Sequence, residues 1–236
     1  MLKYYEGTVF NTDAEVLVNT VNCFGVMGAG IALEFKLRYP SMFIKYEEMC
    51  KRNEYKVGIP RLYSSKSKMI LNFPTKNHWR APSKIEWIEE GLRYFAANYK
   101  RAEISSIAFP KLGTSNGGLK WEEVKPLMEK YLGNLDEIDV TICLDDLKEA
   151  EGIEKKMVDD FNSTPFDLLQ KNFRINNKQS EIIKNNLPLK RFWILSTLPG
   201  VGEKTYEKLF SQYYKKYNIE ADLNEDYNLA EQLTLF

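Results

Sequence analysis

Histidine is nearly absent from this sequence: His78 is the only one among 236 residues. A catalytic centre built on two histidines, or a metal centre held by several imidazoles, is therefore excluded. The three cysteines, Cys23, Cys50 and Cys143, are far apart and form no CxxC pair. Their spacing predicts neither a zinc site nor a disulfide framework, and we expect no metal and no other cofactor.

Long apolar runs and an excess of one charge are also missing. No stretch of 18 apolar residues occurs, and the first residues, Met1 to Glu6, lack the apolar segment of a secretory signal. The formal net charge is zero, so no bulk field attracts a polyanion. We therefore expect a cytoplasmic protein that does not enter a membrane.

Strand-like and helical patterns alternate over residues 1–146, which predicts an α/β sheet with helices on both faces. The expected strands are residues 3–7, 16–21, 69–74, 104–110 and 140–144. The expected helices are residues 31–38, 42–53, one that begins near residue 83, and 121–132. Ser83 and Glu86 have the spacing of a capping box for the third helix.

Beyond this region, residues 147–218 show helical patterns joined by segments rich in asparagine and lysine, and we expect a separate helical module. Residues 171–217 contain ten Lys or Arg against three Glu, whereas residues 220–231 contain five acids and no base. This segregation fits either a solvated charged face or a nucleic-acid-binding surface followed by an acidic tail, residues 219–236.

A glycine-rich stretch, here called the first loop (residues 22–30), lies between an expected strand and an expected helix. Gly25, Gly28 and Gly30 would let the backbone approach a ligand, and the following helix start favours an anion. The pattern also fits a plain tight connection, and its spacing is neither GxGxxG nor a P-loop. Asn19 and Asn22 at the strand end would either bind a sugar hydroxyl or hold the loop.

The second loop (residues 110–119) is also rich in glycine and also precedes a helix. Loops that follow parallel strands meet at one sheet edge, where two such loops would clasp a diphosphate. After a third strand, Lys76 is followed closely by His78, Trp79 and Arg80. Lys76 is either a solvated surface lysine or a reactive group at the far end of this cleft.

At these residues the chain resembles a macrodomain, specifically the DarG-type DNA ADP-ribosyl glycohydrolases, antitoxins that remove ADP-ribose from DNA bases. The matching stretches are Val18 to Lys36, Leu71 to Arg80 and Pro110 to Trp121. The resemblance implies a macrodomain over residues 1–146, with a central mixed sheet flanked by helices on both faces. It also implies binding of ADP-ribose and of ADP-ribosylated DNA, and a DNA ADP-ribosyltransferase toxin as partner.

The resemblance assigns roles to individual residues. It implies Lys76 as the catalytic residue and places adenine near Thr8 and Val9, because many macrodomains carry an acidic residue where Thr8 stands here. Related eukaryotic enzymes carry an aspartate at the position of Gly117, so the partner of Lys76 stays open. The residues expected to bind ADP-ribose are Thr8, Val9, Asn19, Asn22, Val26, Met27, Gly28, Ala29, Gly30, Ile31, Thr75, Leu112, Gly113, Thr114, Ser115, Asn116, Gly117, Gly118 and Leu119.

The chemistry suits a lysine, because cleavage of an N-glycosidic bond creates positive character at the anomeric carbon, which an amine with a lowered pKa can attack. Lys76 would act as nucleophile or base, while His78, Trp79 and Arg80 hold the DNA. Two other functions stay open: hydrolysis of small derivatives such as ADP-ribose-1″-phosphate or O-acetyl-ADP-ribose, and non-catalytic binding of ADP-ribose.

Two further resemblances concern the C-terminal part. Residues 198–205 resemble the hairpin of a helix-hairpin-helix motif, in which Gly200, Gly202 and Lys204 would contact a DNA phosphate; a plain helical hairpin is the alternative. Gln232 to Phe236 resembles the peptide by which bacterial proteins bind the replication sliding clamp. The sequence does not separate DNA binding by the C-terminal module from toxin binding.

Overall fold

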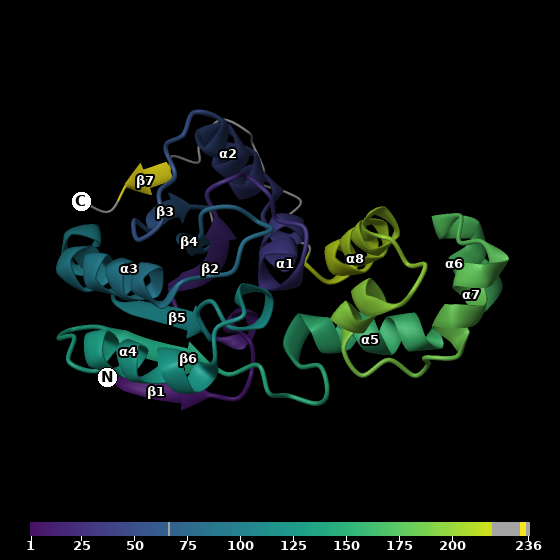
Figure 1. Cartoon of the computed structure of the whole chain (residues 1–236). Helices are drawn as coiled ribbons and strands as arrows, with labels where there is room; N and C mark the ends of the chain where they lie inside the picture. Colours follow the sequence, from purple (N-terminus) through teal and green to yellow (C-terminus); the bar gives the residue numbers. More distant parts are fainter. Residues whose placement is uncertain (66, 219–231, 235–236) are drawn as a thin grey trace. The chain divides into compact units, whose positions relative to one another are not determined.

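The computed structural model describes residues 1–65, 67–218 and the backbone of residues 232–234. The chain divides into two compact units between Asp146 and Leu147 (Figure 1). The short strand Gln232–Thr234 belongs to the first unit. The remaining residues of the expected acidic tail, including Leu235 and Phe236 of the clamp-like peptide, lie outside the described part of the chain.

The first unit is built on one sheet with the strand order β1-β6-β5-β2-β4-β3-β7 (Figure 1). The strands are β1 (Leu2–Tyr5), β2 (Val16–Asn22), β3 (Arg61–Ser64), β4 (Met69–Lys76), β5 (Ser106–Pro110), β6 (Asp139–Cys143) and β7 (Gln232–Thr234). The first five in that order run parallel, while β3 is antiparallel to β4 and to β7. The carboxyl ends of β2, β4 and β5 therefore meet at one edge.

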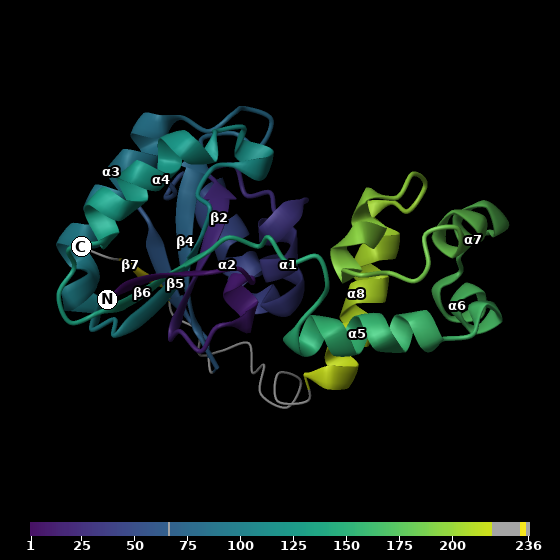
Figure 2. The ribbon, with the colours of Figure 1, turned by 90° about the horizontal axis from the view of Figure 1, so that it is seen from below.

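Helices cover both faces of this sheet, with α1 and α2 on one side and α3 and α4 on the other (Figure 2). Their bounds are α1 (Gly30–Arg38), α2 (Pro40–Lys51), α3 (Ile85–Asn98) and α4 (Trp121–Leu132). Short 3-10 helices add η1 (Val9–Asn11), η2 (Tyr99–Ala102) and η3 (Ser115–Gly117). The predicted mixed α/β sheet with helices on both faces is confirmed.

The alternation of side chains along β2 explains this layering. Val16 and Val18 belong to the core under α3 and α4, whereas Leu17 and Val21 belong to the core under α1 and α2. Because successive residues of a strand point to opposite faces, a central strand that is apolar on both faces needs cover on both sides. The position of β2 in the middle of the sheet follows from its composition.

Three local features differ from the prediction. Strands β3 and β7 were not predicted, because runs of four and three residues are too short to show a period of two. The predicted cap at Ser83 is wrong: Lys84 is the residue before α3, and no side chain caps that helix. The backbone N–H of Ser83 instead donates to the carbonyl of Gly117 (2.9 Å). This bond attaches the residue before Lys84 to the second loop.

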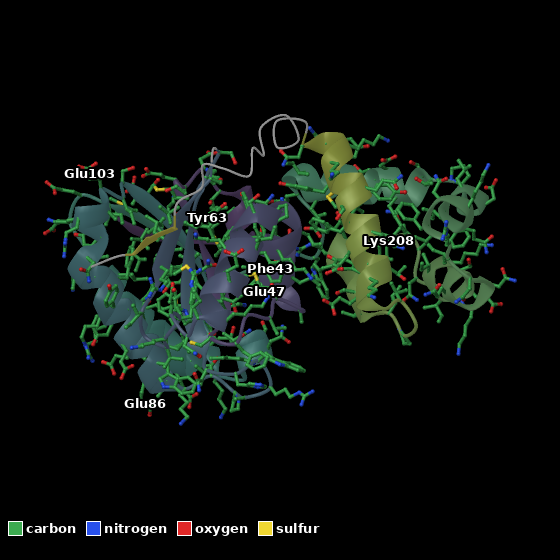
Figure 3. All side chains as sticks on the ribbon, turned by 90° about the horizontal axis from the view of Figure 1, so that it is seen from above. Phe43, Glu47, Tyr63, Glu86, Glu103 and Lys208 are labelled. Atoms are coloured by element: carbon green, nitrogen blue, oxygen red, sulfur yellow. The ribbon has the colours of Figure 1, made fainter. Side chains whose placement is uncertain are left out.

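The second unit is helical, as the sequence predicted. Its elements are α5 (Gly152–Ser163), α6 (Phe166–Phe173), α7 (Asn177–Lys184), the 3-10 helix η4 (Phe192–Thr197) and α8 (Glu203–Tyr217). Aromatic rings form its core: Phe192 lies between Phe161 (5.7 Å between ring centres) and Phe210 (5.9 Å). Charged side chains such as Lys208 project from the exposed side of α8 (Figure 3).

Among the described residues, none of the helices combines the length and the apolar character that a membrane span requires.

Candidate active site

Asn22, the last residue of β2, uses its side-chain amide to hold the first loop. Its Oδ1 accepts hydrogen bonds from the backbone N–H groups of Phe24 (3.0 Å) and Gly25 (3.1 Å). Its Nδ2 donates to the carbonyl of Val26 (2.6 Å), and the hydroxyl of Tyr46 donates to the carbonyl of Asn22 (2.6 Å). Of the two roles that the sequence left open, these bonds support the one in which Asn22 shapes the loop.

The first loop packs against helix α2. A Cβ at Gly25, whose φ is +94°, would lie 3.2 Å from Cβ of Cys50 and 3.6 Å from Cγ of Glu47. Phe43 and Glu47 lie one turn apart on this helix (Figure 3). The first loop therefore rests directly on α2, and only a residue without a side chain fits at Gly25 without strain.

Asn19 lies one layer deeper and has 0% exposure. Its Nδ2 donates to Oδ1 of Asn72 on β4 (2.9 Å) and contacts Sδ of Met27 in the first loop (3.8 Å). Nδ2 of Asn72 in turn donates to the hydroxyl of Tyr55 (3.2 Å). Its Oδ1 has no hydrogen-bond partner among the described residues. The bonds of Nδ2 support a structural role beneath the loop, and the predicted contact of Asn19 with ADP-ribose stays a prediction.

The two glycine-rich loops face each other at the start of α1. Gly30 has a φ of +57°, and a Cβ there would lie 2.6 Å from Nδ2 of Asn116 in the second loop. A side chain at Gly30 would be strained and would displace Asn116. The side chain of Asn116 thus lies against the backbone of Gly30. This contact lies at the start of α1, where free N–H groups favour an anion.

The second loop is a turn closed by its own backbone. The carbonyl of Thr114 accepts from the N–H groups of Gly117 (3.0 Å) and Gly118 (2.6 Å), and the carbonyl of Gly113 accepts from Leu119 (3.1 Å). Gly113 and Gly118 adopt φ values of +66° and +79°, which favour glycine. A loop held in this way is ordered before a ligand binds, which lowers the entropic cost of binding.

The predicted ligand contacts in the two loops differ in exposure. Exposed positions are Ala29, Gly30, Ser115, Asn116 and Gly118, and half-buried ones are Val26, Gly28, Ile31, Thr114 and Leu119. Buried positions are Met27, Leu112, Gly113 and Gly117. The side chain of Leu112 has 0% exposure and packs in the core. Only backbone groups of Leu112 and Met27 therefore remain for a ligand.

Ser83 supports the second loop, a role that the sequence did not indicate because its spacing imitates a helix cap. It is 5% exposed, and its Oγ has no hydrogen-bond partner among the described residues. A Cβ at Gly117 would lie 2.6 Å from this Oγ. An aspartate at Gly117, as in the related eukaryotic enzymes, would therefore require Ser83 to move.

Lys76, the last residue of β4, joins the two loops. Its carbonyl accepts a hydrogen bond from the N–H of Cys23 in the first loop (2.9 Å), and its Nζ donates to the carbonyl of Asn116 in the second. Partial burial lowers the pKa of Lys76 from its usual value of 10.5. A lowered pKa raises the fraction of neutral amine, which is the nucleophilic and basic form.

Thr8, Val9 and Thr75 lie near the same sheet edge and are buried, at 8%, 1% and 4% exposure. The hydroxyl of Thr8 donates to Oδ1 of Asn11 (2.6 Å), and that of Thr75 donates to the carbonyl of Val21 (3.5 Å). Both hydroxyls are committed within the protein. The carbonyls of Thr8 and Val9 accept from the N–H groups of Asn11 (3.1 Å) and Thr12 (3.3 Å). The predicted contacts of Thr8 and Val9 with a ligand would therefore use their N–H groups.

The sequence and the fold were compared with those of known proteins. The Macro domain family model matches residues 18–128. The structure of the macrodomain of Mycobacterium tuberculosis DarG is similar, with 45% sequence identity and a TM-score of 0.58, over 61% of this chain and 97% of that one.

The chain belongs to the macrodomain family.

Curated relatives of this macrodomain include the DNA ADP-ribosyl glycohydrolase of Mycobacterium tuberculosis, with 46% identity over 146 residues. That match covers 60% of this chain and 42% of the relative, so the chain spans about two fifths of the length of that protein. A structure of Thermosipho africanus DarTG in complex with ADP-ribose is also similar, with 38% identity and a TM-score of 0.59, over 65% of this chain and 44% of that one.

Beside Lys76, the macrodomain exposes a cluster of aromatic side chains that includes one residue the sequence analysis did not single out. The ring of Phe24 meets the ring of His78 edge-on, with 4.5 Å between centres. His78 stacks with Trp79 (5.8 Å), and the guanidinium of Arg80 lies 4.4 Å from the centre of the Trp79 ring. Phe24 stands out in sequence only as a large apolar residue within a glycine-rich loop.

In the second unit, the predicted DNA-binding hairpin lies between η4 and α8. Gly200 has a φ of +85°, and its carbonyl accepts a hydrogen bond from Nε2 of Gln179 (2.8 Å). Gly202 precedes the first turn of α8, and Lys204 is exposed. The segment before the hairpin is a six-residue 3-10 helix, so only one side of the hairpin is an α-helix. The helix-hairpin-helix assignment stays a prediction.

Proposed function

We propose that this macrodomain is a DNA ADP-ribosyl glycohydrolase, a hydrolase that breaks the N-glycosidic bond between ADP-ribose and a DNA base. The observation that carries the proposal is the position of Lys76, whose Nζ binds the carbonyl of Asn116 where the two glycine-rich loops meet. The names of the curated relatives from Mycobacterium tuberculosis and Thermus aquaticus, both DNA ADP-ribosyl glycohydrolases, support it.

In this proposal the two loops bind the diphosphate of ADP-ribose. Backbone N–H groups at residues 28–31 and 113–116 would face the phosphate oxygens, because the start of α1 and the glycine turns leave little side-chain cover. The N–H groups of Gly117 and Gly118 close the second loop by donating to the carbonyl of Thr114. Backbone groups of Thr8 and Val9 would contact adenine at the same sheet edge. The distal ribose then lies toward Lys76.

The proposed reaction uses the neutral amine of Lys76. As the bond between the DNA base and the anomeric carbon breaks, positive character develops on that carbon, and the electron pair leaves with the DNA base, which takes up a proton from water. If Nζ of Lys76 is the nucleophile, it forms a C–N bond to this carbon, and water then hydrolyses that bond to release ADP-ribose and the free amine. If Nζ is the general base, it takes a proton from the water whose oxygen forms the new bond to this carbon. Its lowered pKa supports both roles, because each requires the unprotonated amine.

The exposed cluster beside Lys76 favours DNA over a small ADP-ribose derivative as the substrate. We expect the wild type to release ADP-ribose from an ADP-ribosylated single-stranded oligonucleotide at least about tenfold faster, as kcat/KM, than from ADP-ribose-1″-phosphate, since base stacking contributes about 1–3 kcal/mol. Chromatography of the released ADP-ribose measures both rates. A faster reaction with the phosphate derivative would identify a small-molecule hydrolase, and binding without turnover of either substrate would identify a reader.

Replacement of Asn22 tests whether the first loop must be preformed. Asn22→Ala removes the acceptor of three loop N–H groups, those of Phe24, Gly25 and Val26 (3.4 Å), and the donor to the carbonyl of Val26. We expect the Kd for ADP-ribose to rise about tenfold to a hundredfold, since each lost bond contributes about 0.5–1.5 kcal/mol. Isothermal titration calorimetry measures this change. Asn98→Ala is the matched control, because Asn98 lies in α3, where its Nδ2 donates to the carbonyl of Tyr94 (2.7 Å), and it should leave the Kd unchanged. An unchanged Kd in Asn22→Ala would show that the loop forms without this side chain.

Partners beyond the substrate belong to the same proposal. A DNA ADP-ribosyltransferase toxin is the proposed partner, supported by the Thermosipho africanus relative, a "DNA ADP-ribosyl transferase-DNA ADP-ribosyl glycohydrolase fusion protein" with 38% identity over 162 residues. A cytoplasmic location completes the proposal. The clamp contact through Gln232 to Phe236 and the DNA contact through Gly200, Gly202 and Lys204 stay predictions without further support.

A further inference from the structure

Two large aromatic side chains are exposed on the surface beside Lys76. Phe24 is 56% exposed and Trp79 is 41% exposed, and they come from two different segments, the first loop and the turn after β4. Exposed aromatic rings that gather on one surface mark a binding site more often than single exposed residues do. Here His78 joins them, because its ring contacts both.

Hydrogen bonds hold both segments of this cluster. On one side, the N–H of Phe24 donates to Oδ1 of Asn22 (3.0 Å). On the other, the N–H of Arg80 donates to Nδ1 of His78 (3.2 Å), and the N–H of Ala81 donates to the carbonyl of His78 (3.0 Å). The rings are therefore positioned in the absence of a ligand, which reduces the cost of stacking a further ring upon them.

The cluster begins at the proposed reaction centre. Phe24 follows Cys23, whose N–H binds the carbonyl of Lys76 (2.9 Å), and His78 lies two residues beyond Lys76 in the chain. The two glycine-rich loops already account for the diphosphate of ADP-ribose in the proposed function. A group that reaches the cluster would therefore belong to the other side of the bond to be cleaved.

We propose that Phe24 and Trp79 form a stacking platform for an unpaired DNA base next to the ADP-ribosylated nucleotide, with Arg80 contacting the adjoining phosphate. This inference rests on the proposed function and deepens it, because it names the residues that would hold the strand next to the modified nucleotide. Aromatic rings stack on any base, whereas a guanidinium supplies the charge that a phosphate requires. An exposed aromatic surface beside a positive charge therefore fits single-stranded DNA, which offers both unpaired bases and phosphates.

The decisive experiment compares two unmodified, fluorescently labelled single-stranded oligonucleotides, one normal and one with abasic positions that keep the phosphates but lack the bases. Fluorescence anisotropy gives the Kd of each for the full chain. We expect the wild type to prefer the normal strand by about tenfold or more, since each stacked base contributes about this factor. Phe24→Leu should lower the preference to about twofold or less and leave the Kd for ADP-ribose unchanged.

Tyr4→Leu is the matched control, because Tyr4 is an aromatic residue of the same unit with 41% exposure outside the cluster, and it should keep the preference. A full preference in Phe24→Leu would overturn the platform, as would an equal loss of ADP-ribose affinity, which would show that Phe24 only supports the loop. Wild type that prefers the normal strand but does not cleave ADP-ribosylated DNA would refute the proposed function and leave the platform standing. Cleavage of ADP-ribosylated DNA by a wild type that binds both oligonucleotides equally would refute the platform and leave the proposed function standing.

Discussion

Lys76→Ala is expected to lower kcat for release of ADP-ribose from modified DNA by about a thousandfold or more, because it removes the nucleophile or base. The Kd for ADP-ribose should stay within about threefold of the wild type, since the bonds that shape the two loops remain. The first loop is held by the Asn22 side chain and by the backbone carbonyl of residue 76, and the second loop is closed by its own backbone bonds. Single-turnover kinetics and calorimetry separate the two quantities. Lys111→Ala is the matched control: Lys111 lies in the second loop but forms an ion pair with Asp146 (2.8 Å) and should leave kcat unchanged.

The pH dependence gives an independent check on Lys76. Burial lowers its pKa from 10.5, so the neutral amine forms at a lower pH than in an ordinary lysine. If the neutral amine is the active form, kcat should rise with pH and level off above an apparent pKa that is below 10.5. A rate that falls as pH rises, or full activity of Lys76→Ala, would contradict the assignment.

In the second unit, Glu154→Ala is expected to cost about 3–5 kcal/mol of stability, the usual effect of removing one partner from a buried ion pair. The side chains of Glu154 and Arg191 are 11% and 6% exposed. Both carboxylate oxygens of Glu154 accept from Nε of Arg191 (3.1 and 3.0 Å), and Oε1 also accepts from the N–H of Phe192 (2.8 Å). The pair thus ties α5 to η4 beside the aromatic core.

Hydrogen exchange followed by mass spectrometry tests this in the full chain, because it reports each unit separately. Protection of the amides in α5 and α8 should fall by about two to four orders of magnitude, at about 1.4 kcal/mol for each tenfold change. Lys216→Ala is the control: its ion pair with Asp160 is more exposed (58% and 19%), and its loss should have little effect. Replacing both partners, as in Glu154→Leu with Arg191→Leu, should restore much of the protection, because no buried charge is left behind. Unchanged protection in Glu154→Ala would show that the ion pair contributes nothing to the stability of the second unit.

Local pattern was enough to predict the architecture. The strands β2, β4, β5 and β6 are segments of five to eight residues in which apolar residues predominate, and their alternation with helical patterns is visible without tertiary contacts. Loops that follow parallel strands must meet at one edge, so the proximity of the two glycine-rich loops and Lys76 could also be inferred. The short strands β3 and β7 could not be inferred, because they owe their conformation to a neighbouring strand.

What the sequence by itself determined about this protein is therefore the α/β fold, the order of its loops and the presence of a lysine at the loop edge. Each of these depends on residue spacing within one segment. The tertiary structure alone decided that Asn19 is buried, that Lys76 binds the carbonyl of Asn116, and that Phe24 joins the aromatic cluster. Each of those outcomes depends on which distant segment supplies the partner, and spacing along one segment carries no information about that.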